Sequence, residues 1–135
     1  MTTATRIITW IALIAGVVAL LLGLTRWATG NDNVRNIHML FGITLAFSFL
    51  ILSIIMVATR GMRLWGVAGI VYALILPVFG IAQLQLLTGN LHWLIQVAHL
   101  LVGLGALTLI QITYTRYLRL KQPASSQSTI TQAGR

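Results

Sequence analysis

Four apolar stretches, each long enough to cross a lipid bilayer, constrain the fold of this chain more than any other feature. They cover roughly residues 7–27, 38–58, 64–87 and 91–114. A bilayer core about 30 Å thick takes about 20 helical residues. The stretches are rich in Leu and Ile, and they do not alternate apolar with polar residues as the strands of a barrel do. We therefore expect four transmembrane helices.

The composition indicates an all-α integral membrane protein. Of the 135 residues, 58% are apolar, which exceeds what a soluble domain of this size needs. Short connections predict an antiparallel four-helix bundle over residues 1–121. Residues 122–135 lack long apolar runs and are expected to form a flexible cytoplasmic tail. We interpret residues 7–27 as a retained span, since a secretory signal has a shorter apolar core.

The basic residues predict the orientation of the bundle in the cell (inner) membrane. Seven of the nine Lys and Arg lie before the first stretch, between the second and third, or after the fourth. The other two, Arg26 and Arg35, flank Asp32 on the opposite side. The positive-inside rule then places both termini in the cytoplasm. It also explains the net charge of +8 without a nucleic-acid partner.

A loose internal repeat relates the first and second halves of the chain. Residues 29–31 and 88–90 both read Thr-Gly-Asn, and each triplet is followed by a histidine, His38 or His99, in the next apolar stretch. A tandem repeat of two helices gives the second and fourth helices equivalent orientations. We therefore expect them to lie diagonally across the bundle.

His38 and His99 are the strongest candidates for a functional site. They follow their triplets by about seven and nine residues, so at 1.5 Å per residue their depths differ by only about 3 Å. Imidazoles that project inward from facing helices are good axial ligands for haem iron. We predict that both ligate one haem b near the outer leaflet. The alternative is that they contact water or lipid headgroups at the interface.

Each histidine has a glycine four residues further on, Gly42 or Gly103. Residues four apart share a helix face, so the missing side chain leaves space beside each histidine. A flat macrocycle or a neighbouring helix could occupy that space, since small residues commonly pack helices in membranes.

Further candidate haem contacts lie closer to the outer surface. His92 and Gln96 share one face of the fourth helix with His99, and His92 is about 10 Å above His99, where a propionate could reach. Arg26 and Arg35 are candidate cations for the propionates. Their alternative role is to extend toward the interface as ordinary basic residues. The chain has no cysteine, which excludes a disulfide, a thiolate-bound metal and a c-type haem attachment.

Residues 79–112 resemble helices 3 and 4 of one half of a haem A synthase, and His38 stands where that family has a ligand histidine. These enzymes look like two fused four-helix bundles, and residues 7–117 correspond to one half. The resemblance implies a haem-binding bundle. Val34 stands where the family has a glutamate implicated in oxidation of the haem methyl group, and the outer-loop cysteines of many members are missing. These departures weigh against hydroxylation chemistry.

Three functions follow from this pattern. The first is a b-type cytochrome that passes electrons or holds haem, with a membrane-protein partner or a second copy of itself. Two histidine ligands leave no open iron position, which favours electron transfer over catalysis. The second is a structural or pigment-binding subunit of a respiratory or photosynthetic complex, in which a histidine contacts chlorophyll magnesium. The third is a minimal haem-modifying enzyme related to haem A synthase.

Overall fold

The computed structural model describes residues 3–83, 85–86 and 89–121, and this part of the chain is all-α. It contains four long helices and one short 3-10 turn: α1 (Thr3–Thr29), η1 (Asp32–Val34), α2 (Arg35–Ala58), α3 (Arg63–Ala82) and α4 (His92–Lys121). All four helices are long and apolar enough to cross a membrane. The predicted four-helix membrane fold is confirmed.

The C-terminal ends of α3 and α4 differ most from the sequence prediction. The predicted third helix is too long, because α3 ends at Ala82 and the N–H groups of Gln85 and Leu86 both donate to the Ala82 carbonyl oxygen, which closes a turn. The fourth helix is longer than predicted and continues to Lys121. Hydropathy marks where apolar residues stop, whereas Arg and Lys can continue a helix into water. The predicted tail at 122–135 lies outside the described residues.

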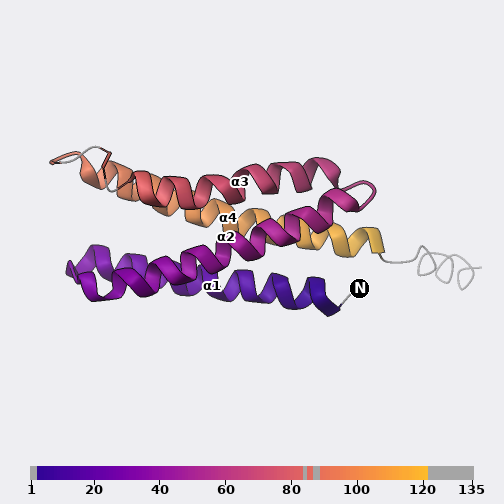
Figure 1. Cartoon of the computed structure of the whole chain (residues 1–135), viewed down its shortest axis with the longest axis horizontal. Helices are drawn as coiled ribbons and strands as arrows, with labels where there is room; N and C mark the ends of the chain where they lie inside the picture. Colours follow the sequence, from indigo (N-terminus) through magenta and orange to yellow (C-terminus); the bar gives the residue numbers. More distant parts are fainter. Residues whose placement is uncertain (1–2, 84, 87–88, 122–135) are drawn as a thin grey trace, which may run out of the picture.

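The helices form an antiparallel bundle in which α2 and α4 are diagonal (Figure 1). Helix α2 packs extensively on both α1 and α3, while α4 touches α1 and α3 less closely. In Figure 1 the α1–α2 ribbons and the α3–α4 ribbons diverge toward the end that carries the α1–α2 turn. The diagonal arrangement agrees with the two-helix repeat.

The core lies along α2, where Phe49, Leu52 and Met56 are fully buried. Helix α3 approaches α2 at Gly66. A Cβ atom on this residue would lie 2.5 Å from the backbone nitrogen of Val57 and 2.7 Å from the carbonyl oxygen of Ser53. Close backbone contact through small residues is the usual way in which helices associate in lipid.

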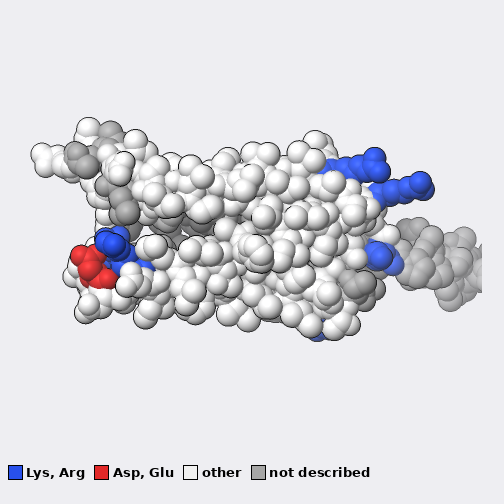
Figure 2. Space-filling model, viewed as in Figure 1, with Lys and Arg blue, Asp and Glu red and all other residues white. Residues whose placement is uncertain are grey.

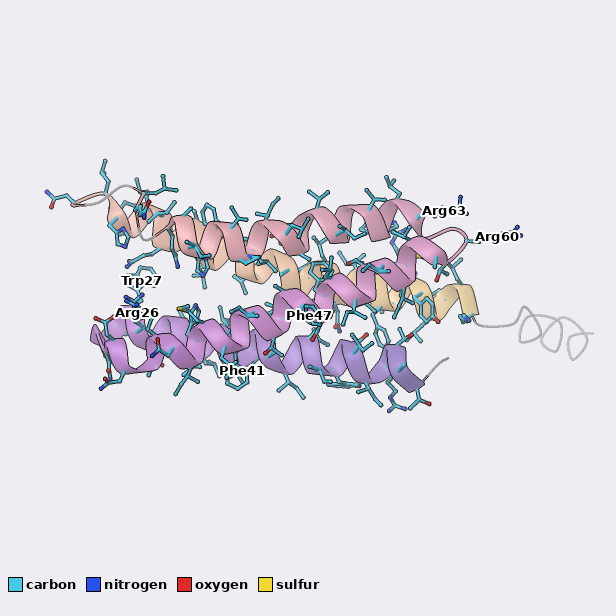
Figure 3. All side chains as sticks on the ribbon, in the orientation of Figure 1. Arg26, Trp27, Phe41, Phe47, Arg60 and Arg63 are labelled. Atoms are coloured by element: carbon cyan, nitrogen blue, oxygen red, sulfur yellow. The ribbon has the colours of Figure 1, made fainter. Side chains whose placement is uncertain are left out.

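The charged residues of the described chain lie at the two ends of the bundle, and its flanks are uncharged (Figure 2). Figure 3 shows Arg26 and Trp27 at one end and Arg60 and Arg63 at the other. We call the end with Arg26 the turn end, because it holds the α1–α2 turn. An uncharged band between two polar ends is the pattern that a bilayer requires.

The two Thr-Gly-Asn triplets share a backbone feature. Gly30 and Gly89 have φ of 65° and 94°, a region that favours glycine. The Gly30 N–H donates to the Arg26 carbonyl oxygen over 2.9 Å, which caps α1. The glycine of each triplet therefore has the same conformational reason to be there. Thr88 lies outside the described residues.

Candidate functional site

The structure brings His38 and His99 together between the diagonal helices α2 and α4. Their ring centroids are 6.1 Å apart, and the ring planes meet at 59°. His38 is in the first turn of α2, and His99 is in the second turn of α4, so both lie toward the turn end. The predicted proximity of the two rings is present. That they hold a haem stays a prediction.

The distance between the rings suits one metal ion between two imidazoles. A metal–imidazole nitrogen bond is about 2 Å long and a ring centroid lies about 1.1 Å from each ring atom, so two opposed ligands have centroids about 6 Å apart. The observed 6.1 Å agrees with this separation. Planes that are tilted to one another are compatible with ligation, since each imidazole can rotate about its own metal–nitrogen bond.

Helix α1 holds the ring of His38. The Nδ1 atom of His38 lies 2.8 Å from the backbone carbonyl oxygen of Ala19. A carbonyl oxygen only accepts, so Nδ1 carries a proton, and in the neutral ring Nε2 then keeps its lone pair. Gly23 lies one turn further along α1, and a Cβ atom there would be 3.1 Å from His38 Cε1. Hydrogen bonds of this kind orient histidines that bind metals.

His99 is held by ring contact instead. Its ring stacks on Phe79 of α3 with centroids 6.0 Å apart and planes 10° apart. A Cβ atom on Gly80 would be 3.7 Å from His99 Cε1, which is ordinary contact. The Nδ1 atom of His99 is buried and has no hydrogen-bond partner within the described residues. Such an atom in a native structure calls for an ion, a water molecule or a ligand beside it.

Gly42 and Gly103 do not pack against a helix. A Cβ atom on either residue would meet no atom of the described chain within 4 Å. Small-residue helix packing, one of the two roles predicted for these glycines, is therefore wrong for the described part of the bundle. Open space at the glycine one turn below each histidine fits a flat macrocycle, which remains the other prediction.

The predicted propionate cations have different surroundings. Arg26 donates from Nε and Nη2 to Oδ1 of Asp32 over 3.0 Å and 2.9 Å. The structure thus gives Arg26 a partner from η1, across the α1–α2 turn. Arg35 is an exposed residue at the start of α2. Figure 3 shows Arg26 and Trp27 on the side of α1 that faces the α3–α4 pair.

His92 and Gln96 occupy the first turns of α4. The Nδ1 atom of His92 lies 3.4 Å from the carbonyl oxygen of Leu86, which is long for a hydrogen bond. This contact links the start of α4 to the turn that follows α3. Gln96 is half-buried one turn closer to His99. The described residues contain no group of three or more His, Asp or Glu side chains that could hold a metal ion.

Four residues beside the histidine pair were not predicted as site residues: Ala19, Gly23, Phe79 and Gly80. The first two have a sequence signal, because Gly16, Ala19 and Gly23 share one face of α1. That stripe of small residues indicates the close approach of another helix. Nothing in the sequence singles out Phe79, whose role depends on how α3 packs against α4.

The fold and the site define a class of protein: a four-helix membrane bundle with a histidine pair between diagonal helices near one end. Comparison with protein-family models, with curated proteins and with solved structures finds no match. The resemblance to haem A synthases therefore stays a prediction.

Proposed function

We propose that this protein is a membrane b-type cytochrome in which His38 and His99 bind the iron of one haem b. The observation that carries the proposal is the 6.1 Å separation of the two rings on diagonal helices. The bond from His38 Nδ1 to Ala19 adds to it, because it leaves Nε2 with a lone pair for a metal.

The remaining site residues divide into those that make space and those that carry charge. Gly42 and Gly103 keep the flanks of the pair open. Arg35 supplies positive charge for propionates at the turn end. Arg26 supplies it too when a propionate replaces Asp32 as its partner. Haem supplies one-electron chemistry when it is bound. The protein orients the two imidazoles and surrounds the site with apolar helices.

The charge distribution supports an orientation with the histidine pair near the outer leaflet. Of the described basic residues, six lie at the end opposite the turn end: Arg6, Arg60, Arg63, Arg116, Arg119 and Lys121. Arg26 and Arg35 lie at the turn end with Asp32. With the protein in the cell (inner) membrane, the positive-inside rule then places both termini in the cytoplasm. The redox partner is another membrane protein or a second copy of this chain.

One observation weighs against the haem-modifying alternative. Val34, which stands at the position of the family's glutamate, has no carboxylate, and Asp32 is the chain's one acidic residue. Arg26 binds that carboxylate over 2.9 Å. A carboxylate that is ion-paired at the surface is a poor candidate for proton transfer at a substrate. Electron transfer or haem handling therefore fits these residues better than oxidation of the macrocycle.

The test is the visible spectrum of the purified full-length protein, expressed with a haem supply, before and after dithionite. We expect sharp reduced α and β bands that disappear in His38→Ala and in His99→Ala. Thr108→Ala is a matched control on α4, since Thr108 is exposed and bonds only to the Leu104 carbonyl of its own helix.

Each alternative gives a different result in the same experiment. A colourless protein would overturn the proposal in favour of a structural subunit. A chlorophyll spectrum would favour pigment binding. Extraction of an oxidised macrocycle after turnover would favour the haem-modifying enzyme.

A further inference from the structure

The two histidines of the pair are held in different ways. His38 donates a hydrogen bond through Nδ1 to the Ala19 carbonyl oxygen over 2.8 Å. The Nδ1 atom of His99 is buried but has no partner in the described part of the chain. The ring of His99 is instead stacked on Phe79. One imidazole is therefore fixed in direction by a hydrogen bond, whereas the other is held by a flat apolar contact.

This difference predicts unequal ligand strength. A hydrogen bond from the ring nitrogen that faces away from the metal raises the basicity of the nitrogen that binds the metal. It also prevents the ring from turning away from the metal. Loss of such a bond typically lowers metal affinity by about 10-fold to 100-fold. Stacking on an aromatic ring constrains the plane of the imidazole, but it allows sliding and rotation within that plane. His99 is therefore the weaker ligand of the two.

The surroundings of Phe79 place an apolar outer surface next to the ring on which His99 stacks. Phe79 also lines a shallow apolar hollow on the outward face of α3, together with Val71, Leu74, Ile75, Val78 and Ala82. Within the described chain this face is uncharged and is left to lipid. A neutral diatomic molecule dissolves in hydrocarbon, so it reaches the far side of Phe79 without crossing a polar layer.

We propose that His99 is the exchangeable ligand and that a small neutral diatomic molecule takes its place at the metal. The exchange breaks the coordinate bond of the His99 nitrogen, which keeps its electron pair, and the incoming molecule donates an electron pair instead. No net oxidation or reduction occurs. This inference rests on the proposed haem binding, and it adds a ligand-binding function to a site otherwise suited to electron transfer.

Displacement of His38 is disfavoured by its contacts. Its ring lies against Gly23 of α1, and its Nδ1–H is bound to Ala19. Moving this ring away from the metal breaks that hydrogen bond. Movement of the His99 ring breaks no hydrogen bond with a described residue.

The test uses the haem-loaded, dithionite-reduced full-length protein, with carbon monoxide as the probe. We expect carbon monoxide to shift the spectrum of the unsubstituted protein. We expect His99→Ala to retain haem and to bind carbon monoxide at least tenfold more tightly, because no internal ligand competes. His38→Ala should lose most of its haem, since only the weaker ligand remains.

A pair of substitutions at Gly80 tests the hydrogen-bond argument directly. A Cβ atom here lies 3.7 Å from His99 Cε1, so the hydroxyl of Gly80→Ser comes within reach of the adjacent Nδ1. We expect Gly80→Ser to weaken carbon monoxide binding about tenfold relative to Gly80→Ala, which adds the same Cβ without an acceptor.

The outcomes separate this inference from the proposed function. Failure of the protein to bind haem overturns both. Haem binding with no response to saturating carbon monoxide overturns the inference alone. Retention of haem by His38→Ala and its loss from His99→Ala would also overturn it, because the order of ligand strength would be reversed.

Discussion

The imidazole of His38 on α2 donates a hydrogen bond to the backbone carbonyl oxygen of Ala19 on α1 across 2.8 Å. The carbonyl lies one turn before Gly23, whose missing side chain leaves room for the ring. The direction of this histidine therefore depends on the packing of α1 against α2. Helix α1, which carries neither histidine, is therefore a part of the site.

Gly23→Val should displace the ring of His38. A Cβ atom at this position already comes to 3.1 Å from Cε1, and the two methyl groups of valine require the ring to move. We expect haem content to fall by about 10-fold or more, because the hydrogen bond that orients the ligand is lost. The measurement is haem per protein in purified samples. Thr25→Val, an exposed position on the same helix, is the control, and equal haem content in both variants would contradict the role given to Gly23.

Leucine at Gly42 or Gly103 should block haem binding without harming the haem-free bundle. Neither glycine has an atom of the described chain within 4 Å of an added Cβ, and replacement of glycine within a helix stabilises it by up to about 1 kcal/mol. Thermal unfolding of the haem-free variants should therefore match or exceed that of the unsubstituted protein. Haem titration should show weakened binding. Unchanged haem affinity in both variants would show that the open space does not hold the macrocycle.

Gly66→Ala should destabilise the bundle, in contrast to Gly103→Ala. The new methyl group at Gly66 would meet backbone atoms of Val57 and Ser53 at 2.5 Å and 2.7 Å, and these atoms cannot rotate away. Overpacking of this kind typically costs about 1–3 kcal/mol of unfolding free energy. Circular dichroism during titration with a denaturing detergent measures the difference. Equal stability of the two variants would mean that α2 and α3 are not in close contact at Gly66.

The number of helices could be predicted from the sequence because bilayer thickness sets the length of each apolar run. The ends of α3 and α4 could not, since hydropathy reports where lipid ends and hydrogen bonding decides where a helix ends. Ala82 closes α3 by accepting bonds from Gln85 and Leu86. Lys121 still belongs to α4 although the apolar residues end earlier.

The meeting of His38 and His99 could be predicted because a repeat puts equivalent residues at equal depth. Their outer contacts could not be predicted. The small residues around Ala19 indicate a close helix approach, but Ala19 contributes a backbone carbonyl, which every residue possesses, so the hydrogen bond itself could not be predicted. Spacing also could not separate Gly66, which packs helices, from Gly42, which faces open space. Those roles depend on the positions of neighbouring helices.

The predicted orientation can be tested with single cysteines, because the natural chain contains none. Asn33 lies in η1 at the turn end and Thr3 lies at the start of α1, and both are exposed. With the termini in the cytoplasm, a membrane-impermeant maleimide added to intact cells should label Asn33→Cys and spare Thr3→Cys. Both variants should react after the membrane is opened. The reverse pattern would place the histidine pair near the inner leaflet.

The most direct test of the central claim is electron paramagnetic resonance of the oxidised, haem-loaded protein. Two imidazole ligands impose a strong ligand field, so we predict a low-spin ferric signal that changes to a high-spin signal in His99→Ala. A high-spin signal in the unsubstituted protein, or a low-spin signal that survives both His38→Ala and His99→Ala, would contradict ligation of one iron by this pair.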